Sequence, residues 1–484
     1  MRLADVLRDT NSLSVLGSST IEVTDVTEDS RAVSSGSLYA AIKGTQFDGH
    51  RFIPNALAAG AVAIVCEDIP RLTPQSATFV VVPNSGRALG EIASAFYGHP
   101  SRKMRVVGVT GTNGKTTTAT LLYLIATHAG IRAGLLSTID NIIGDRPAAA
   151  THTTPDPVTL QRTLRAMLDD GCSCVFMEVS SHAVVQHRVA GLNFAGGVFT
   201  NLTHDHLDYH GTMEEYFLAK RSFFDGLSRD AFALTNADDP HGQRIVGRAI
   251  AAVHSYGIRT EASFRGVITS NDIDGIQVRV RDCQIKSHLV GRFNAYNLLA
   301  SFSCASLLGF SDRIILKALE GARPIRGRFD WVRASNGCVG VVDFAHTPDG
   351  LENLVRAARD VFPGRRLTLV MGCGGDRDRD KRPVMGRIGS SAADSMIVTS
   401  DNPRSENEQV IIEEILAGVP PHLMQRVVAI PDRRKAIEIA CTNARPDGVV
   451  LVAGKGHEEY QEVRGEKIPF SDKVVLQQFL SSSM

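Results

Sequence analysis

The residues best suited to chemistry lie in a short glycine-rich segment. Residues 110–116 read Thr-Gly-Thr-Asn-Gly-Lys-Thr and stand between an apolar run at 104–110 and a helical pattern at 115–129. Glycines allow successive backbone N–H groups to turn toward phosphate oxygens, and the N-terminus of a helix adds a positive partial charge. Lys115 would neutralise the β- and γ-phosphates, and the Thr116 hydroxyl would bind Mg²⁺. The glycines are closer together than in the usual phosphate-binding loop, so an incidental turn is the alternative, but the full set of residue types favours a nucleoside triphosphate site.

Ligands for a cation are expected where neighbouring strands end. Glu178 lies at the end of the apolar run at 174–179, and a His- and Asp-rich segment at 201–210, which contains His206, follows the next run. Mg²⁺ prefers carboxylate oxygens, with histidine as an occasional partner. The same segment would also suit zinc or be a solvated loop, and the residue types alone leave these alternatives open.

One predicted helix carries a lysine, Lys220, on an otherwise apolar face. Thr212 and Glu215 have the spacing of a capping box that starts this helix. The residues on the face are Met213, Phe217, Lys220 and Phe224. Burial lowers the pKa of a lysine, and a neutral amine can react with CO₂ to give an anionic carbamate. The alternative is a lysine whose stem packs and whose ammonium reaches water, and without further context this alternative is the better interpretation.

Apolar runs alternate with helical patterns over most of the chain, so we expect an α/β protein. Runs rich in Val and Ile with little polar alternation are typical of parallel strands that are buried on both faces. The runs expected to form strands are 104–110, 132–138, 174–179, 197–201, 338–343, 366–372, 395–400 and 448–454. Helices are expected at 115–129 and 157–171, and the first hundred residues look mixed α/β.

Length and charge narrow the class of protein. At about 150 residues per domain, a chain of 484 residues suggests three domains. Lys and Arg number 52 and so do Asp and Glu, whereas general nucleic-acid binders usually carry a basic surface. No apolar run approaches the ~20 residues that cross a bilayer, and the N-terminus lacks a secretory apolar region. We therefore expect a cytoplasmic protein whose partners are small molecules, not nucleic acid or a membrane.

Seven segments, in order along the chain, resemble the motifs of the Mur ligase family of cell-wall amino acid ligases. They are 110–116, 178–182, 201–210, 291–297, 327–328, 342–349 and 454–458. The resemblance covers nearly the whole chain and implies three α/β domains. These are a mixed α/β domain for a uridine nucleotide at 1–101, a central parallel-sheet ATPase domain of the P-loop type at 102–325, and a Rossmann-like domain for an amino acid at 326–484.

The resemblance implies an ATP-dependent ligase of peptidoglycan biosynthesis. Such an enzyme would add a third amino acid to the D-glutamate of UDP-N-acetylmuramoyl-L-alanyl-D-glutamate through an acyl phosphate. ATP would be a substrate and Mg²⁺ the cofactor, and we expect a monomer. The alternatives are a folylpolyglutamate synthetase-like ligase, which lacks the N-terminal domain, and a nucleotide-dependent switch, which would leave Lys220 unexplained.

The resemblance also assigns roles to residues of the first two domains. Catalytic roles fall to Lys115, Glu178, His206 and Lys220, with Lys220 as a carbamate, and Mg²⁺ would be held by Thr116, Glu178 and His206. The ATP-contacting positions are Gly111, Thr112, Asn113, Gly114, Lys115, Thr116, Thr117, Asn294, Asn297, Arg328 and Asp343. The positions that would hold the muramoyl dipeptide are Ser30, Thr45, Gln46, Phe47, Thr153, Thr154, Ser180, Gln186 and Arg188.

Residues 401–404, Asp-Asn-Pro-Arg, resemble the motif of family members that use meso-diaminopimelate rather than L-lysine. In this interpretation Arg404 faces the distal carboxylate of the amino acid and Glu458 receives the ammonium group on the same carbon. L-Lysine would leave Arg404 buried and unpaired and would be rejected for that reason. The positions implied to bind the amino acid are Arg377, Asp401, Asn402, Pro403, Arg404, Gly454 and Glu458. Without the resemblance, a surface arginine after a turn is the better interpretation of Arg404, and a ligase that uses L-lysine remains the alternative.

Four positions depart from the commonest family pattern. Phe344 stands where tyrosine is usual and therefore lacks a hydroxyl group. Phe329 and Asp330 replace methionine and glutamate, and Asp380 stands where glycine is frequent.

Overall fold

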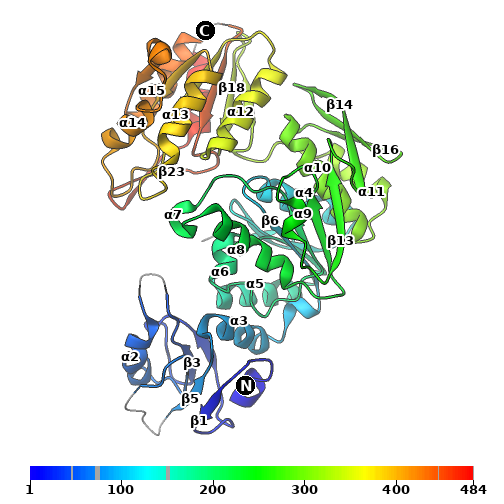
Figure 1. Cartoon of the computed structure of the whole chain (residues 1–484), viewed down its shortest axis with the longest axis vertical. Helices are drawn as coiled ribbons and strands as arrows, with labels where there is room; N and C mark the ends of the chain where they lie inside the picture. Colours follow the sequence, from blue (N-terminus) through cyan, green and yellow to red (C-terminus); the bar gives the residue numbers. More distant parts are fainter. Residues whose placement is uncertain (45–46, 71–76, 149–152, 445, 483–484) are drawn as a thin grey trace.

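Three β-sheets, each covered by helices, follow one another along the long axis of the molecule (Figure 1). The structure is a computed structural model that describes residues 1–44, 47–70, 77–148, 153–444 and 446–482. We name the three α/β domains by their sheets: the N-terminal domain lies at the bottom of Figure 1, the central domain in the middle and the C-terminal domain at the top.

The N-terminal domain contains a five-stranded sheet in the order β1-β5-β4-β3-β2. Only β1 runs antiparallel to its neighbour. The strands are β1 (Ser14–Leu16), β2 (Asp25–Thr27), β3 (Ser37–Ala40), β4 (Ala63–Cys66) and β5 (Thr78–Val81). The helices are α1 (Leu3–Val6), α2 (Ile53–Ala58) and α3 (Ser85–Phe96).

The central domain contains an eleven-stranded sheet in the order β16-β15-β14-β13-β12-β11-β6-β10-β7-β8-β9. Its strands are β6 (Arg105–Thr110), β7 (Ala133–Leu136), β8 (Asn141–Ile143), β9 (Arg146–Ala148), β10 (Cys174–Glu178), β11 (Gly196–Phe199), β12 (Phe232–Asn236), β13 (Ala252–Gly257), β14 (Phe264–Asp272), β15 (Gly275–Val280) and β16 (Cys283–Ser287). Its helices are α4 (Lys115–His128), α5 (Pro157–Asp169), α6 (Ser181–Val185), α7 (Leu207–His210), α8 (Met213–Asp225), α9 (Gly242–Ile245), α10 (Arg292–Leu307) and α11 (Asp312–Glu320).

Two apolar cores cover the two faces of the central sheet. Val107 packs into a core formed with α4, α10 and α11, whereas its neighbour Val106 packs into a core formed with α5 and α8. Successive strand residues point to opposite faces, so a continuous apolar run such as β6 requires helices on both sides. The central strand is therefore rigid, and the loop that follows it is held at a defined position.

The C-terminal domain contains a six-stranded sheet in the order β17-β18-β22-β19-β20-β21 and a separate hairpin. The strands are β17 (Asp330–Arg333), β18 (Val339–Asp343), β19 (Leu367–Met371), β20 (Ser395–Val398), β21 (Val427–Ala429) and β22 (Val449–Ala453), with β23 (Tyr460–Val463) and β24 (Glu466–Pro469) in the hairpin. The helices are α12 (Pro348–Val361), α13 (Lys381–Ala392), α14 (Glu408–Leu416), α15 (Arg433–Asn443) and α16 (Asp472–Ser482).

The α/β prediction is confirmed, and each of the eight predicted strands is present within a few residues of its expected bounds. The central strands of the two larger sheets pair parallel, as expected, whereas several strands toward the edges pair antiparallel. β14, β15 and β16 pair antiparallel, as do β7, β8 and β9, and β17 with β18. The strands β14, β15 and β16 were not predicted, because exposed or half-buried residues interrupt their buried ones and they lack the continuous apolar run that marked the central strands.

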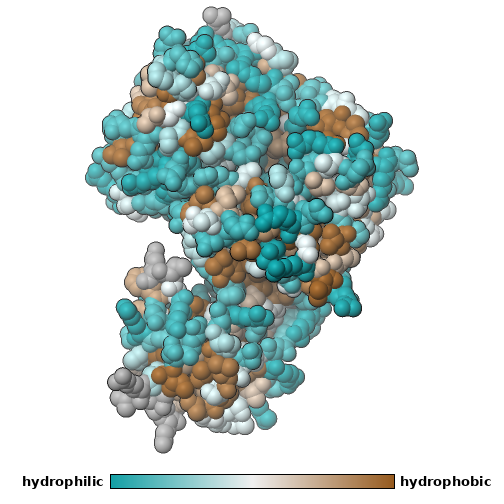
Figure 2. Space-filling model, in the orientation of Figure 1, coloured by the Kyte–Doolittle hydropathy of each residue, from teal (hydrophilic) through white to brown (hydrophobic). Residues whose placement is uncertain are grey.

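The N-terminal domain packs tightly on the central domain. A Cβ atom at Gly90 of α3 would lie 2.7 Å from the carbonyl oxygen of Ala190, so only glycine allows this approach. Asn84 and His187 lie 3.3 Å apart across the same interface. The face of the molecule in Figure 2 is mostly hydrophilic, and within the described ranges no helix is long and apolar enough to cross a membrane.

Candidate active site

The glycine-rich loop connects β6 to α4, as the sequence predicts. Gly111 and Gly114 have φ angles of +150° and +86°, and a Cβ atom at Gly114 would lie 2.4 Å from Oδ1 of Asn297. Side chains are excluded from both positions, so the loop backbone stays accessible to a ligand. The Lys115 ammonium donates to the carbonyl oxygens of Gly111 (3.0 Å) and Thr112 (2.8 Å).

The expected cation ligands Thr116 and Glu178 meet at the carboxyl ends of neighbouring strands. The Thr116 hydroxyl donates to Oε1 of Glu178 at 2.8 Å, and both side chains are buried. The backbone N–H of Thr138, just beyond β7, donates to the same Oε1 at 2.7 Å, and its hydroxyl donates to Oε2 at 3.2 Å. The Glu178 carboxylate is therefore fixed by three donors, and the group offers adjacent oxygens of the kind that Mg²⁺ prefers.

Lys220 lies in the buried interior of the site and is 1% exposed. Its ammonium donates to the Gly111 carbonyl at 2.9 Å, the oxygen that Lys115 also uses, and lies 4.5 Å from the Tyr216 ring centroid. Burial and, after it, the neighbouring Lys115 lower the pKa of Lys220 well below its usual value. The capping box and the apolar face of α8 are confirmed, because Thr212 accepts from the Glu215 N–H and Phe217 and Phe224 are buried beside Lys220.

His206 contacts neither Thr116 nor Glu178 through any hydrogen bond of the described residues. Its Nε2 lies 3.3 Å from Oδ2 of Asp205, its ring stacks edge-on against His182, and burial lowers its pKa to about 3. In the part of the chain that the structure describes, no three His, Cys, Asp or Glu side chains gather around one point.

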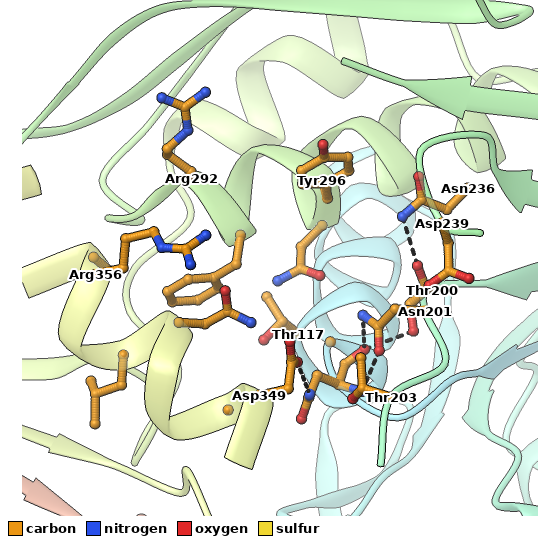
Figure 3. A pocket seen from close by; sticks show the side chains of 18 of the residues that line it. Thr117, Thr200, Asn201, Thr203, Asn236, Asp239, Arg292, Tyr296, Asp349 and Arg356 are labelled. Carbon is orange, nitrogen blue, oxygen red and sulfur yellow. Dashed lines mark hydrogen bonds between the residues drawn. The ribbon is translucent and has the colours of Figure 1, made fainter. Parts of the chain in front are cut away.

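A cavity of about 620 Å³ opens between the central and C-terminal domains (Figure 3). The lining residues predicted from sequence are Asn113, Gly114, Thr116, Thr117, Asn297, Arg328 and Asp343. Arg292 and Tyr296 of α10 line it from the central domain, and Asp349 and Arg356 of α12 line it from the C-terminal domain. The cavity is large enough for a nucleotide, and the glycine-rich loop forms one of its walls.

Arg328 links the two domains at this cavity. Its Nη2 donates to the Thr116 hydroxyl at 3.4 Å, and its guanidinium lies 4.6 Å from the ring centroid of Phe344. The ring that stacks on Arg328 needs no hydroxyl for this contact, so the departure at Phe344 leaves the stacking intact. Asn113 Nδ2 also donates across the domains, to Oδ2 of Asp349 at 2.8 Å.

Asn294 and Asp343, two further predicted ATP positions, are held by hydrogen bonds within the protein. Asn294 is buried and does not line the cavity, but its Oδ1 accepts from Asn297 Nδ2 at 2.9 Å and so orients Asn297. Asp343 accepts from the backbone N–H groups of Phe329 (2.6 Å) and Ala345 (2.8 Å), and burial raises its pKa.

Four residues predicted to hold the muramoyl dipeptide form one hydrogen-bonded group beside Glu178. Arg188 donates to the Thr154 carbonyl at 2.8 Å and to Oε1 of Gln186, while Thr154 bonds to the backbone of Glu178 and Ser180. Thr153 joins them through the Thr138 hydroxyl at 3.0 Å. In the N-terminal domain, Phe47 is 70% exposed and Ser30 is partly buried. Thr45 and Gln46 lie outside the described residues.

The acceptor residues are clustered, but the prediction of a buried, unpaired Arg404 is wrong. Arg404 is only partly buried; it donates to the Gly375 carbonyl at 2.6 Å and lies 3.4 Å from Oε2 of Glu462. Glu462 sits on β23, about 60 residues away in sequence, so sequence spacing gave no sign of it. Arg377 is exposed and donates to the Asp376 carbonyl.

The other acceptor residues converge on a lysine that the sequence analysis passed over. The Lys455 ammonium lies 2.8 Å from Asn402 Oδ1, 2.9 Å from Glu458 Oε2 and 3.6 Å from Asp401 Oδ1. Lys455 stands between Gly454 and Gly456. A lysine between two glycines is the feature of the sequence that could have marked it as a candidate site residue. Pro403 is buried, and its carbonyl lies where a Cβ atom of Gly375 would clash.

A phosphate-binding loop that is completed by an arginine from a second domain is the site of a nucleotide-dependent enzyme. Family models agree with this class. The model described as Mur ligase family, catalytic domain, matches residues 22–97; Mur ligase middle domain matches 109–305; and Mur ligase, glutamate ligase domain, matches 327–456. The chain belongs to the Mur ligase family.

Three known proteins illustrate the relationship. A UDP-N-acetylmuramoyl-L-alanyl-D-glutamate–2,6-diaminopimelate ligase from Bacteroides thetaiotaomicron is 46% identical over 482 residues, which cover 99% of this chain and 100% of the relative. A solved structure of a ligase with the same name has a TM-score of 0.69 and 29% identity, and covers 99% of this chain and 98% of its own. A folylpolyglutamate synthase from Mycobacterium tuberculosis, complexed with ADP and AMPPCP, has a TM-score of 0.61 at 17% identity and covers 75% of this chain and 91% of its own.

Proposed function

We propose that the chain is an ATP-dependent ligase that adds meso-diaminopimelate to the D-glutamate of UDP-N-acetylmuramoyl-L-alanyl-D-glutamate. The observation that carries the proposal is the contact of Arg328 with Thr116, which brings a cation of the C-terminal domain to the phosphate-binding loop of the central domain at one cavity of about 620 Å³. Full-length similarity to ligases of this name supports the same substrates. The domain boundaries at 101/102 and 325/326 remain a prediction.

The reaction is a phosphoryl transfer followed by an acyl transfer. A carboxylate oxygen of D-glutamate attacks the γ-phosphorus of ATP, the bond to the β,γ-bridging oxygen breaks, and an acyl phosphate and ADP form. The amine of the diamino acid then attacks the acyl carbon, loses a proton, and expels inorganic phosphate. A carboxylate approaching a triphosphate is repelled, so charge neutralisation dominates the barrier. Lys115 would exchange its loop carbonyls for phosphate oxygens, and Arg328 would neutralise the opposite side.

The oxygens of Thr116 and Glu178 fit an Mg²⁺ ion, because two suitable ligands lie 2.8 Å apart and Mg²⁺ usually completes its shell with water and phosphate. His206 is proposed as a further ligand on the resemblance alone, because its Nε2 lies beside Asp205 and not beside Thr116 or Glu178. When bound, the ion would offset charge on the phosphates.

Lys220 is proposed to be a carbamate. Its lowered pKa favours the neutral amine, which adds to CO₂ with loss of one proton and so becomes an anion. That anion would lie beside Lys115, which has no carboxylate partner among the described residues, and would provide the countercharge that Lys115 lacks.

The dipeptide is proposed to bind along the group formed by Thr153, Thr154, Ser180, Gln186 and Arg188, with its uridine toward Ser30 and Phe47. Arg188 is the fixed cation of this group and would orient the D-glutamyl carboxylates. The group adjoins Glu178, so the reacting carboxylate would lie beside the γ-phosphate.

Phosphate release tests the proposal directly. We expect release only with ATP, the muramoyl dipeptide and meso-diaminopimelate together, and mass spectrometry should detect the tripeptide product. Activity with a folate and glutamate would instead favour a folylpolyglutamate synthetase, and preference for L-lysine would correct the acceptor. The N-terminal sheet, β1–β5, argues against the folate enzyme, since that relative covers only 75% of this chain.

A further inference from the structure

Lys455 is the most completely enclosed charge of the acceptor cluster. Its side chain is 0% exposed, and its ammonium lies 2.8 Å from Asn402 Oδ1 and 2.9 Å from Glu458 Oε2. Gly454 and Gly456, which flank it, have φ angles of +117° and +56°. Cβ atoms there would lie 2.4 Å from Asp401 Oδ2 and 2.7 Å from Phe344 Cβ, so the loop cannot shift without disturbing both neighbours.

The two carboxylate oxygens of Glu458 have different surroundings, and Lys455 contacts only one of them. Oε2 accepts from Lys455 and also from Asn402 Nδ2 at 2.8 Å, so the two donors saturate it. Among the described residues, no donor reaches Oε1, and the Glu458 side chain is 20% exposed to solvent. Lys455 therefore determines which oxygen of Glu458 is available to a ligand.

The charges around Lys455 do not cancel. One ammonium faces two carboxylates, Asp401 and Glu458, and the adjacent Arg433 is already paired with Asp472 at 2.7 Å. The cluster is left with one negative charge beside a free carboxylate oxygen. An ammonium group of the incoming amino acid would complete both the hydrogen bonding and the charge.

We propose that Lys455 is a positioning residue that sets specificity for the distal ammonium group of the acceptor amino acid. It acts through Glu458 and Asn402 and does not touch the acceptor itself. The inference rests on the proposed function, and it separates two recognition tasks: Arg404 serves the distal carboxylate, and Lys455, through Glu458, serves the distal ammonium.

Two acceptors separate these tasks experimentally. meso-Diaminopimelate carries both distal groups, whereas 2-aminopimelate carries the distal carboxylate and no distal amine. Wild type should prefer meso-diaminopimelate in kcat/KM by about 10- to 100-fold, the range of one hydrogen bond between charged groups. Lys455→Met should remove most of that preference by raising KM for meso-diaminopimelate, while kcat/KM for 2-aminopimelate changes less than twofold.

The controls exclude a general structural effect. Lys467→Met removes an exposed lysine of the same domain and should leave the preference unchanged. ADP formation from ATP and dipeptide without acceptor, measured as a single turnover, should be equal in wild type and Lys455→Met. Glu458→Gln leaves Lys455 paired with Asn402 and Asp401, so it should lose the same preference even if Lys455→Met does not fold. The double variant should lose no more than either single variant, because the two residues act in series.

The outcomes are distinct. A preference that persists in Lys455→Met, or in Glu458→Gln should Lys455→Met fail to fold, overturns the inference. An equal fall for both acceptors also overturns it, because that indicates a merely structural role. Wild type that forms ADP but ligates neither acceptor overturns the proposed function, and the positioning role falls with it.

Discussion

Two lysines buried in different domains are held in opposite ways. Lys220 in the central domain has a carbonyl and an aromatic ring as its partners, and no carboxylate of the described residues forms an ion pair with it. Lys455 in the C-terminal domain has two carboxylates and an amide. A buried cation without a countercharge is unstable and therefore ready to react or to meet an anion, whereas a paired one fixes its neighbours. The contrast indicates that the surroundings of Lys220 in the central domain serve the reaction, whereas those of Lys455 in the C-terminal domain serve recognition of the acceptor.

The largest effect is expected at Lys220. Lys220→Met should abolish amide formation because it removes the proposed carbamate, and it should leave the fold intact because methionine is an apolar side chain of similar length. In Lys220→Ala, whose short side chain leaves room at the site, short-chain carboxylates should partly restore activity. In ¹³C-bicarbonate, wild type should give a carbamate signal that Lys220→Met lacks. Full activity of the variant, or wild type without that signal, would contradict this role; exposed Lys317 on α11 provides the matched control.

Lys115→Met tests the other lysine that lacks a carboxylate. Loss of one transition-state charge contact should lower kcat by about 100- to 1,000-fold, or about 3–4 kcal/mol. Its melting temperature should stay equal to that of wild type or rise, since the side chain has no ion pair in the described structure. Turnover close to wild type would refute the phosphate role.

The next largest difference is expected in the free energy of unfolding of variants at Lys455 and Lys220. Lys455→Met leaves Asp401 and Glu458 without their cation and should lower the free energy of unfolding by about 3 kcal/mol. Lys220→Met should change it by less than about 1 kcal/mol, or raise it, because a charge without a partner is removed. Denaturant titration of both variants measures the difference, and equal losses would mean that pairing does not distinguish the two sites.

Arg404→Ala tests how the C-terminal domain recognises the distal carboxylate of the acceptor amino acid. The preference for meso-diaminopimelate over L-lysine should fall by about tenfold in kcat/KM, the value of one modest charged contact. A larger penalty is not expected, because Glu462 keeps Arg404 paired when L-lysine is offered. Arg434→Ala, at an exposed position, is the control, and an unchanged preference in Arg404→Ala would show that the arginine does not read the carboxylate.

The smallest effect concerns pH. Hydrogen bonds from the buried Arg382 lower the pKa of Glu406 from 4.5 to about 2. The folded-state pKa is depressed, so the pair stabilises the protein fully above pH 4.5 and loses that contribution as the pH falls toward 2. Glu406→Gln should cost about 1 kcal/mol at pH 7 and flatten the pH dependence of the melting temperature in this window. An unchanged slope would contradict the pairing.

The chemistry of the nucleotide site could be predicted because its residues are contiguous or follow strand ends. Lys115 and Thr116 belong to one loop, and Glu178 closes a strand that any parallel sheet places beside it. The roles of Lys455 and Glu462 could not be predicted in this way, because they depend on contacts between distant residues. Lys455 contacts Asn402, 53 residues away, and Glu462 contacts Arg404, 58 residues away. The edge strands β14–β16 were missed for a related reason, since antiparallel pairing leaves one face to water and weakens the apolar signal.

The hydrogen bond from Arg328 to Thr116 has a consequence for how much ATP the enzyme consumes without making product. Each domain alone holds only part of the positive charge that a triphosphate needs, so ATP bound to a separated chain lacks the complete set of cations. Hydrolysis of ATP without substrate would then be slow until the two domains meet around ATP and the muramoyl dipeptide. The chain would then act as a coincidence detector, because it transfers the phosphoryl group of ATP only when the carboxylate of the muramoyl dipeptide is bound as well.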